Sequence, residues 1–273
     1  MLSCLVGSEM CIRDSSTRVF EVGKGVGGTW YWNRYPGARC DVESVQYSYQ
    51  FDTELEQEWT WSEKYSTQPE ILRYANHVAD RFDLRDNIQF ETRVISAEYS
   101  EADKLWVLET DRNEKVSSRY CVFATGCLSS SNVPKFEGYE TFKGLSYHTG
   151  RWPHEGVNFS GLRVGVIGTG SSAIQSIPEI AKEANQLTVF QRTANYTIPA
   201  RNSELTEDYV SSIKADYPGL RERARNKPAG YDIPLNSQSV LEVGREDANI
   251  EFQRRWELGL SLIHISEPTR QDS

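Results

Sequence analysis

The pattern of apolar and polar positions is most regular between residues 162 and 193. Arg163–Ile167 alternates and then becomes apolar, which predicts a short buried strand. Ser171–Ala184 carries apolar side chains at helical spacing, and Leu187–Phe190 predicts a second strand. The apolar face expected for that helix consists of Ile174, Ile177, Ile180, Ala181 and Ala184. The order strand, turn, helix, strand predicts a βαβ unit.

A glycine-rich turn joins the first of these strands to the helix. Gly168, Gly170 and Ala173 give the spacing GxGxxA within the stretch GTGSSA. Gly168 permits a tight turn, Gly170 lets the backbone approach a pyrophosphate, and Ala173 is small enough for close helix–strand packing. The helix N-terminus would face the anion, so this stretch predicts a dinucleotide site. An ordinary βαβ crossover is the alternative.

The end of the second strand indicates which dinucleotide is bound. An NAD site has Asp or Glu about 20 residues past the glycines, where it accepts a hydrogen bond from the ribose 2′-hydroxyl. This chain has Gln191, Arg192 and Thr193 there and no acid. Arg192 could hold a 2′-phosphate through charge-assisted hydrogen bonds of about 1.5–3 kcal/mol each. The sequence therefore predicts NADP(H) over NAD(H), with a solvated strand-end Arg192 as the alternative.

Two further elements are indicated near the start of the chain. Arg18–Glu21 predicts a short strand, whose terminal acid Glu21 is placed to accept from a ribose hydroxyl. Thr67–Glu70 is a capping box that opens a helix, on which His77 is expected to face solvent. The apolar face of that helix consists of Ile71, Ala75, Val78, Ala79 and Phe82.

The middle and end of the chain have weaker patterns. Residues 88–124 alternate through three or four short strands, QFETRVISAEY, LWVLET and SRYCVFA, which predict an antiparallel meander. A strand-end turn is expected at residues 124–126. After Thr193 the chain becomes polar, and Val240–Trp256 predicts a charged amphipathic helix with a solvated face.

Composition narrows the classes of partner. A net charge of −9 and a pI near 5.1 argue against nucleic acid or an anionic membrane as the main partner. No apolar run is long enough to span a bilayer. The five cysteines contain no CxxC pair, which predicts a reducing, cytoplasmic location and excludes a zinc ribbon or a redox dithiol. Neither a metal site nor an obligate protein partner is indicated.

Both ends of the chain look unlike the rest. Leu5–Ser15 and Leu260–Arg270 resemble translations of one sequencing adapter read in opposite directions, so residues 1–15 and 260–273 are expected to be non-native. An unusual N-terminus with a short helical tail is the alternative. The only glycine in the first of these stretches, Gly7, cannot form GxGxxG ahead of Arg18. We therefore expect this chain not to bind FAD stoichiometrically.

Two stretches carry a family resemblance. Residues 25–41 combine glycines with four large aromatics, which predicts a loop packed on a flat, polar ligand. The stretch GVGGTWYWNRYPGARCDVES resembles the flavin-contacting segment of Baeyer–Villiger monooxygenases, closest to the phenylacetone and cyclohexanone monooxygenase branch. FKGLSYHTGRWP matches the fingerprint FxGxxxHxxxWP of the same class at every fixed position. Those positions are Phe142, Gly144, His148, Trp152 and Pro153.

The resemblance implies a fold and an activity. The fold is α/β, with two Rossmann-like dinucleotide-binding domains of the three-layer ββα flavoprotein type, truncated at both ends. Residues 16–141 would form part of an FAD-binding domain and residues 142–160 the fingerprint linker. Residues 161–259 would form part of an NADP-binding domain, with a helical insertion from about residue 203. The implied reaction uses FAD, NADPH and O2 to convert a ketone to an ester or lactone through a peroxyflavin.

The resemblance also assigns residues. Asp41 is the catalytic candidate, although a turn aspartate is the alternative, and the arginine that it faces in the family lies in a later segment. His148 and Trp152 would hold the orientation of the two domains. FAD would be lined by Glu21, Gly28, Thr29, Trp30, Tyr31, Trp32, Asp41, Tyr47 and Val94. The nicotinamide end of NADP would be approached by Arg39, Cys40 and Asp41. NADP would be held by Gly168, Thr169, Gly170, Ser171, Ser172, Ala173, Gln175, Arg192 and Thr193.

Three other functions are considered. A flavoprotein disulfide reductase would share two nucleotide sites, but it needs a cysteine pair that this sequence does not contain. A flavin monooxygenase that oxygenates nitrogen or sulfur would share the glycine motifs, but its fingerprint is not expected to end in Trp-Pro. The third alternative is that the chain, being truncated, is inert.

Overall fold

The computed structural model describes residues 16–126, 128, 130–193, 199–228, 230–232 and 242–259. The two adapter-like stretches lie outside the described residues. The chain divides into two compact units, one formed by the residues up to Tyr35 with Gln68–Val157, the other by Pro36–Thr67 with the residues from Asn158 onward. Pro36–Thr67 therefore packs with the second unit, although the sequence placed it in the FAD-binding part. The domain boundaries at residues 141 and 160 stay a prediction.

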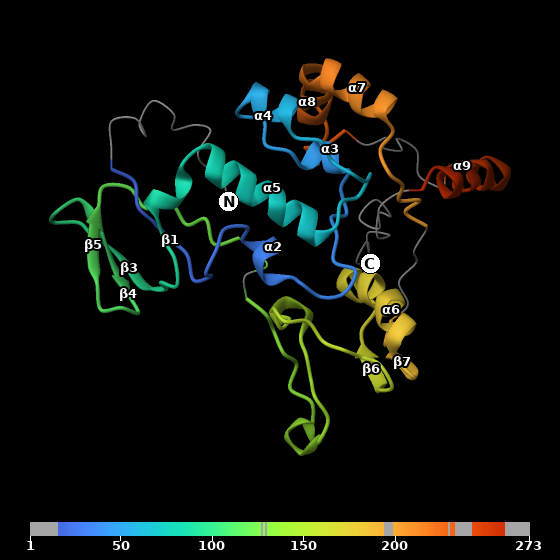
Figure 1. The fold of residues 1–273 in the computed structure, drawn as a ribbon, viewed down its shortest axis with the longest axis horizontal. Coiled ribbons are helices and arrows are strands. Elements are labelled where there is room, and N and C mark those ends of the chain that lie inside the picture. Colours follow the sequence, from blue (N-terminus) through green and yellow to red (C-terminus); the bar gives the residue numbers. More distant parts are fainter. Residues whose placement is uncertain are drawn as a thin grey trace. The chain divides into compact units, whose positions relative to one another are not determined.

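The first unit is built around one amphipathic helix. Helix α5 (Gln68–Arg81) begins next to Thr67, with Pro69 in its first turn as the capping box predicts. It buries Ile71, Tyr74 and Val78 and contacts the short helix α2 (Thr29–Trp32), as Figure 1 shows. One expectation was wrong, because Nε2 of His77 is buried instead of facing solvent. Of the five apolar positions that the sequence indicated, Ile71, Val78 and Ala79 are buried, whereas Ala75 and Phe82 are half-buried.

Two small sheets complete the first unit. Strand β1 (Val19–Phe20) runs parallel to β2 (Ile88–Gln89), which follows the short 3-10 helix η2 (Leu84–Asn87). Strands β3 (Val94–Ser100), β4 (Leu105–Thr110) and β5 (Lys115–Ser118) form an antiparallel sheet in that order. The predicted meander is thus confirmed for its central strands, while β2 belongs to a separate parallel pair.

The predicted last strand of the meander differs from the structure. The stretch SRYCVFA forms a strand only as far as Ser118, where β5 ends. Tyr120, Val122 and Phe123 are 80%, 67% and 61% exposed. A strand needs a hydrogen-bonded neighbour, and the sheets within the described residues place none beside residues 119–124. Residues 119–124 therefore have the alternating sequence of a strand, but they form none because no neighbouring strand pairs with them.

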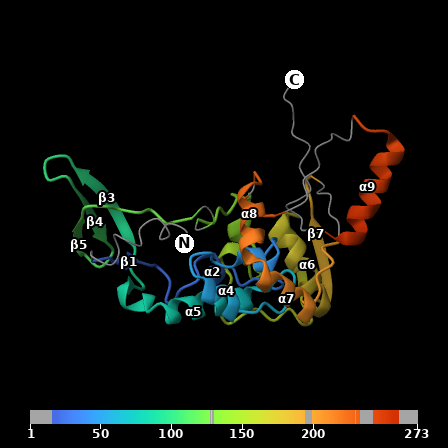
Figure 2. The same cartoon turned by 90° about the horizontal axis from the view of Figure 1, so that it is seen from above.

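The second unit contains the predicted βαβ unit. Strand β6 (Arg163–Ile167) pairs in parallel with β7 (Gln186–Phe190), and Ile167 lies opposite Phe190. The expectation of a buried strand was wrong, because neither strand has a buried residue and Ile167 is 67% exposed. Helix α6 (Ser171–Glu183) connects them and packs on both strands (Figure 1), and Figure 2 shows it beside β7 from above. The expected face is partly wrong, because Ala181 is exposed and Ser176 is buried with Ile180. Ser176 and Ile180 are four residues apart, so the helix buries a narrower stripe than the five-residue face expected from the sequence.

Short helices of two distant segments pack together in the second unit. The first segment forms α3 (Ser44–Tyr47) and α4 (Thr53–Glu58), and Asp52 caps α4 by accepting from Leu55 N at 2.7 Å. The later segment forms α7 (Glu207–Ala215), α8 (Tyr217–Arg225) and α9 (Arg245–Leu258). Apolar side chains from both segments form their core, namely Val45, Leu55, Trp61, Tyr65, Tyr217 and Leu220. A terminal helix forms as predicted, but it runs from Arg245 to Leu258, and positions 240 and 241 of the expected helix lie outside the described residues. The expected amphipathic face was wrong, because α9 buries no residue and takes no part in this core.

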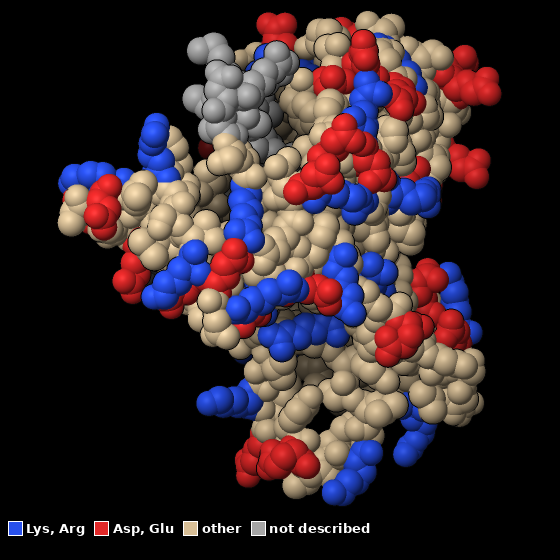
Figure 3. Space-filling model, turned by 60° about the vertical axis from the view of Figure 1, so that its left-hand side comes forward, with Lys and Arg blue, Asp and Glu red and all other residues tan. Residues whose placement is uncertain are grey.

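Surface charge and helix hydropathy complete the description. Basic and acidic side chains are interspersed on the face drawn in Figure 3. Among the helices formed by described residues, none is both long and apolar enough to cross a membrane.

Candidate dinucleotide-binding site

The glycine turn after β6 has the conformation that its sequence predicts. Gly168 has φ +101°, a region that favours glycine, and its N–H donates to the Phe190 carbonyl of the neighbouring strand at 2.9 Å. A Cβ placed on Gly170 would meet nothing within 4 Å. The turn therefore leaves open backbone where a side chain would otherwise stand. This is the shape that a pyrophosphate needs for close approach.

The start of α6 is suited to an anion. Its N-cap is Gly170, which has no side chain to cap the helix, and its first turn carries no acidic residue. The first N–H groups of a helix have no intrahelical acceptor and carry a partial positive charge. The structure thus brings together Gly168, Thr169, Gly170, Ser171, Ser172 and Ala173 around one helix N-terminus, as the sequence predicts.

The end of β7 supplies the residues beside this turn. Arg192 is exposed and follows the strand directly, with Thr193 next to it. Gln191, which sequence reasoning did not select, donates through Nε2 to Thr169 Oγ1 at 2.9 Å. This hydrogen bond joins the strand end to the glycine turn. The role of Arg192 at a 2′-phosphate stays a prediction.

Asp41 lies against the second turn of the same helix. Gln175 donates through Nε2 to Asp41 Oδ1 at 2.8 Å and to the Arg39 carbonyl at 3.2 Å. Its Oε1 accepts from Arg39 N at 3.2 Å. Burial raises the pKa of the Asp41 carboxyl, and the hydrogen bond from Gln175 opposes that shift. The candidate catalytic carboxylate is therefore held by the helix that starts at the glycine turn.

The neighbours of Asp41 have structural partners. The Arg39 guanidinium lies 3.6 Å from a Glu63 carboxylate oxygen. The Cys40 thiol is 3% exposed and donates to the Val42 carbonyl at 3.0 Å. Burial raises the pKa of Cys40 to about 11, so it remains a neutral thiol near pH 7. This protonation state makes Cys40 unsuited to nucleophilic chemistry.

The predicted flavin residues of the first unit surround α2. Oε1 of Glu21 accepts from Gly23 N at 2.6 Å, so the carboxylate turns back onto its own loop. Gly28 has φ +52° and precedes Thr29–Trp32. The rings of Tyr31 and Trp32 meet edge-to-face at 5.0 Å. Val94 stands apart from this cluster in the sequence, at the start of β3, and Tyr47 of α3 belongs to the second unit.

One aromatic partner was missed by sequence reasoning. The His154 ring lies 5.0 Å from Tyr31 and 6.2 Å from Trp32. His154 is exposed overall, but its loss of some solvent contact lowers the pKa of the imidazole, and the nearby Arg34 charge adds to the effect. The aromatic loop thus packs partly on its own unit. His154 follows Pro153 of the fingerprint, and that adjacency was the available signal.

The fingerprint residues form local contacts within the first unit. His148 caps the short 3-10 helix η4 (Thr149–Arg151), because its Nδ1 accepts from Gly150 N at 3.1 Å. Trp152 is buried and stacks near Tyr147 with 5.6 Å between ring centroids. Pro153 accepts through its carbonyl from Gly156 N at 3.1 Å. These contacts give His148, Trp152 and Pro153 local structural partners, and the role in domain orientation stays a prediction.

The first part of the fingerprint has a simpler explanation. Phe142 is 63% exposed and follows the 3-10 helix η3 (Tyr139–Thr141). A Cβ on Gly144 would come within 2.7 Å of two atoms of the Phe142 ring. A side chain at position 144 would therefore require the exposed Phe142 ring to move.

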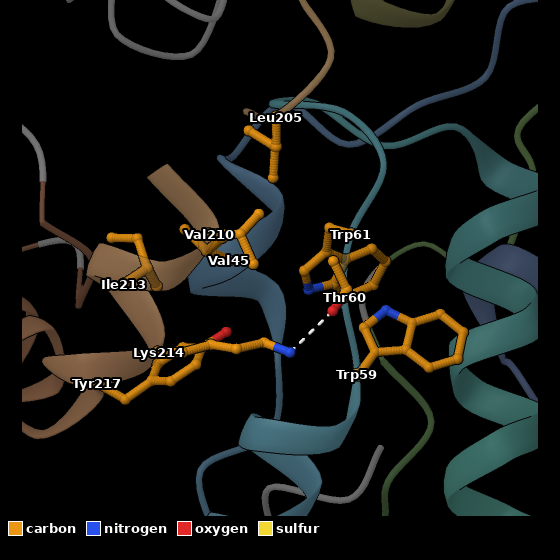
Figure 4. A pocket seen from close by; sticks show the side chains of 9 residues that line it. All are labelled: Val45, Trp59, Thr60, Trp61, Leu205, Val210, Ile213, Lys214 and Tyr217. Atoms are coloured by element: carbon orange, nitrogen blue, oxygen red, sulfur yellow. Dashed lines mark hydrogen bonds between the residues drawn. The ribbon is translucent and has the colours of Figure 1, made fainter. Parts of the chain in front are cut away.

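A separate small cavity lies between helix α7 and residues 59–61, as Figure 4 shows. Its volume is about 10 Å³, which leaves room for one water molecule at most. Lys214 crosses it and donates to Thr60 Oγ1 at 2.8 Å and to the Gln57 carbonyl at 2.6 Å. The cavity is a packing gap and is too small for a nucleotide or a ketone.

A βαβ unit whose turn and helix start suit a pyrophosphate defines a dinucleotide-binding protein of α/β class. The comparisons with known proteins narrow this class. The chain belongs to the family described as "Pyridine nucleotide-disulphide oxidoreductase", which matches residues 44–252.

Individual relatives are similar over most of the chain. One named "Baeyer-Villiger monooxygenase", from Pseudooceanicola batsensis, is 42% identical over 244 residues, covering 89% of this chain and 45% of the relative. A phenazine N-monooxygenase from Lysobacter antibioticus is 40% identical over 242 residues, covering 89% and 44%. A solved structure described as "Oxidized steroid monooxygenase bound to NADP" is 56% identical with a TM-score of 0.83, covering 89% of this chain and 46% of that one.

These findings confirm the resemblance to Baeyer–Villiger monooxygenases and the α/β dinucleotide-binding fold. The chain spans slightly less than half the length of the relatives that it matches.

Proposed function

We propose that this chain is part of an FAD- and NADPH-dependent monooxygenase that inserts one oxygen atom of O2 beside a ketone carbonyl, giving an ester or lactone. The observation that carries the proposal is the partly buried Asp41 carboxylate held by the helix of the glycine turn. The names of the similar proteins support the oxygenation chemistry. The sequence lacks the CxxC pair that a dithiol reductase would need. The same cysteine usage fits the reducing cytoplasm, where we propose that the enzyme is located.

The residues of the second unit fit NADPH. The N–H groups at the start of α6 would bind the pyrophosphate, and the open space at Gly170 admits it. Arg192 would pair with the 2′-phosphate, which an acid at this position would repel. When bound, NADPH supplies a hydride, and FAD supplies the oxygen chemistry with O2.

The residues of the first unit fit part of an FAD site. Glu21 directly follows β1, where its carboxylate would accept from a ribose hydroxyl once it leaves Gly23 N. The positive φ angles of Gly27 and Gly28 let the backbone before α2 approach a flat ring without a Cβ between them. Trp30, Tyr31 and Trp32 would limit access of water there.

Asp41 is the catalytic residue that we propose. Its carboxylate would accept a hydrogen bond from the nicotinamide or balance a cationic group at the reacting centre. Because the carboxylate is partly desolvated, such interactions are stronger than in water.

Oxygenation of a ring nitrogen is the second candidate, because a phenazine N-monooxygenase is similar over the same share of this chain. The test uses the full-length protein that contains this sequence. It is incubated with NADPH, FAD and ¹⁸O2, with a cyclic ketone in one arm and an aromatic N-heterocycle in the other. Mass spectrometry of the products distinguishes the candidates.

The proposal expects a lactone carrying one ¹⁸O atom and requiring NADPH. The Asp41→Asn variant should retain nucleotide binding and lose most of the lactone. A labelled N-oxide without lactone would select the second candidate. NADPH oxidation that yields only hydrogen peroxide in both arms would contradict both.

A further inference from the structure

Gln175 joins helix α6 to the segment that carries Asp41, although the two residues are 134 positions apart in the chain. Its side-chain amide forms a paired set of hydrogen bonds with the peptide groups of Arg39, accepting from N and donating to O, both at 3.2 Å. The same Nε2 donates to Asp41 Oδ1 at 2.8 Å. Both polar ends of the amide are therefore used to bind this one segment.

The backbone of the segment is also pressed onto α6. Gly37 has φ +76°, and a Cβ added there would lie 2.3 Å from the Gln175 carbonyl oxygen. The loop that leads to Asp41 thus runs against the backbone of the helix at the same residue whose side chain binds it. Packing and hydrogen bonds together leave little freedom to the Asp41 main chain.

The titratable groups next to Asp41 on its own segment, and the acid of α6 that faces this segment, have partners other than Asp41. On its own segment, Arg39 pairs with Glu63, and Cys40 is a neutral thiol that donates to Val42 O. On α6, Glu179 pairs with Lys182 at 2.7 Å. The hydrogen bond that the structure gives to the Asp41 carboxylate comes from Gln175.

We propose that Gln175 is a positioning residue, which holds the Asp41 carboxylate at a fixed place relative to the dinucleotide-binding end of α6. Ser171–Ala173 and Gln175 belong to one helix, so a nucleotide bound at the helix start and the Asp41 carboxylate share one rigid element. In this role Gln175 acts on the reaction through Asp41, whether or not it also contacts the nucleotide as the family resemblance implies. For the reaction that it serves, this inference rests on the proposed function.

The test measures the ionisation of Asp41 in the full chain. The chain is labelled with [4-¹³C]aspartate, and the Asp41 carboxyl resonance is assigned from its loss in Asp41→Asn. Titration is compared in wild type, in Gln175→Met and in Gln253→Met. Gln253 is the matched control, because it is a helical glutamine of the same unit that donates to a different carboxylate, that of Glu257.

An N–H donor favours the charged form of its carboxylate acceptor, so its removal should raise the pKa of Asp41 further. We expect Gln175→Met to move the Asp41 titration to higher pH and Gln253→Met to leave it unchanged. Gln175→Asn keeps the amide on a shorter side chain, so its Asp41 titration should lie between those of wild type and Gln175→Met. An Asp41 titration in Gln175→Met equal to that of wild type would overturn the proposal.

A second measurement needs no variant and remains informative if Gln175→Met does not fold. The side-chain ¹⁵N–H resonances of Gln175 in wild type should shift with pH at the midpoint of the Asp41 carboxyl. Gln175 resonances that ignore that midpoint would also overturn the proposal. None of these measurements needs flavin, nucleotide or ketone, so a failure of the proposed oxygenation would be distinguishable from a failure of this contact.

Discussion

The buried ion pair between Arg221 and Glu56 provides the sharpest test of the second unit. The guanidinium of Arg221 lies 2.8 Å from Glu56 Oε1, and the two side chains are 5% and 7% exposed. Arg221 also donates to three carbonyls of the α3 region, those of Val45, Gln46 and Ser48, at 3.2–3.3 Å. One side chain of α8 therefore satisfies the polar groups of a segment 165 residues away from it.

The perturbation is Arg221→Met, which keeps much of the volume and removes the charge. It would leave the Glu56 carboxylate buried without its cation and the carbonyls of Val45 and Ser48 without this donor. Breaking a buried pair by removing one partner costs about 3–5 kcal/mol. With a urea m-value of about 1–3 kcal/mol/M, the unfolding midpoint should fall by about 1–5 M.

The assay is urea unfolding followed by tryptophan fluorescence, since Trp61 is buried in the same unit. Arg223→Met is the control on the same helix, because Arg223 is 51% exposed and pairs with Asp216 and Asp232 at the surface. The control should lose only a small fraction of the stability lost by Arg221→Met. Adding Glu56→Leu to Arg221→Met should recover stability, because no buried charge remains unpaired.

Equal losses in Arg221→Met and Arg223→Met would refute the reasoning. The reasoning would also be refuted if Glu56→Leu lowered the stability of the Arg221→Met variant further, as an independent destabilising substitution would.

Three further predictions concern single side chains. In the full-length protein, Arg192→Ala should weaken NADPH binding far more than NADH binding, measured by fluorescence titration, and an equal loss for both would exclude the 2′-phosphate role. Cys40 has a pKa of about 11, so its alkylation by iodoacetamide in the folded chain should be very slow at pH 8 and accelerate only as pH approaches 11. Rapid alkylation of Cys40 at pH 8 would contradict its burial. Gly37→Ala should lower the thermal unfolding midpoint more than Gly161→Ala. Both glycines have φ near +75°, but only at position 37 would the added Cβ lie 2.3 Å from a backbone oxygen. Equal midpoints for the two variants would mean that the contact of Gly37 with α6 is loose.

Local patterns in the sequence determined the elements whose causes are local. The βαβ stretch was predicted to within a residue, because alternation, a glycine turn and helical spacing each act within a few positions. The helix after Thr67 was predicted for the same reason, since a capping box and Pro69 act on the first turn. The family resemblance also rests on short motifs, which the comparisons confirm.

The tertiary structure decided what depends on distant partners. Residues 119–124 have a strand pattern, but a strand forms only beside a hydrogen-bonded neighbour. His77 was expected at the surface because helical periodicity does not reveal which other elements cover a face. The pairs Asp41–Gln175 and Glu56–Arg221 join segments more than 130 residues apart, and no local spacing encodes such a contact. Burial and hydrogen bonding across these distances assigned Pro36–Thr67 to the second unit and gave Asp41 its partner.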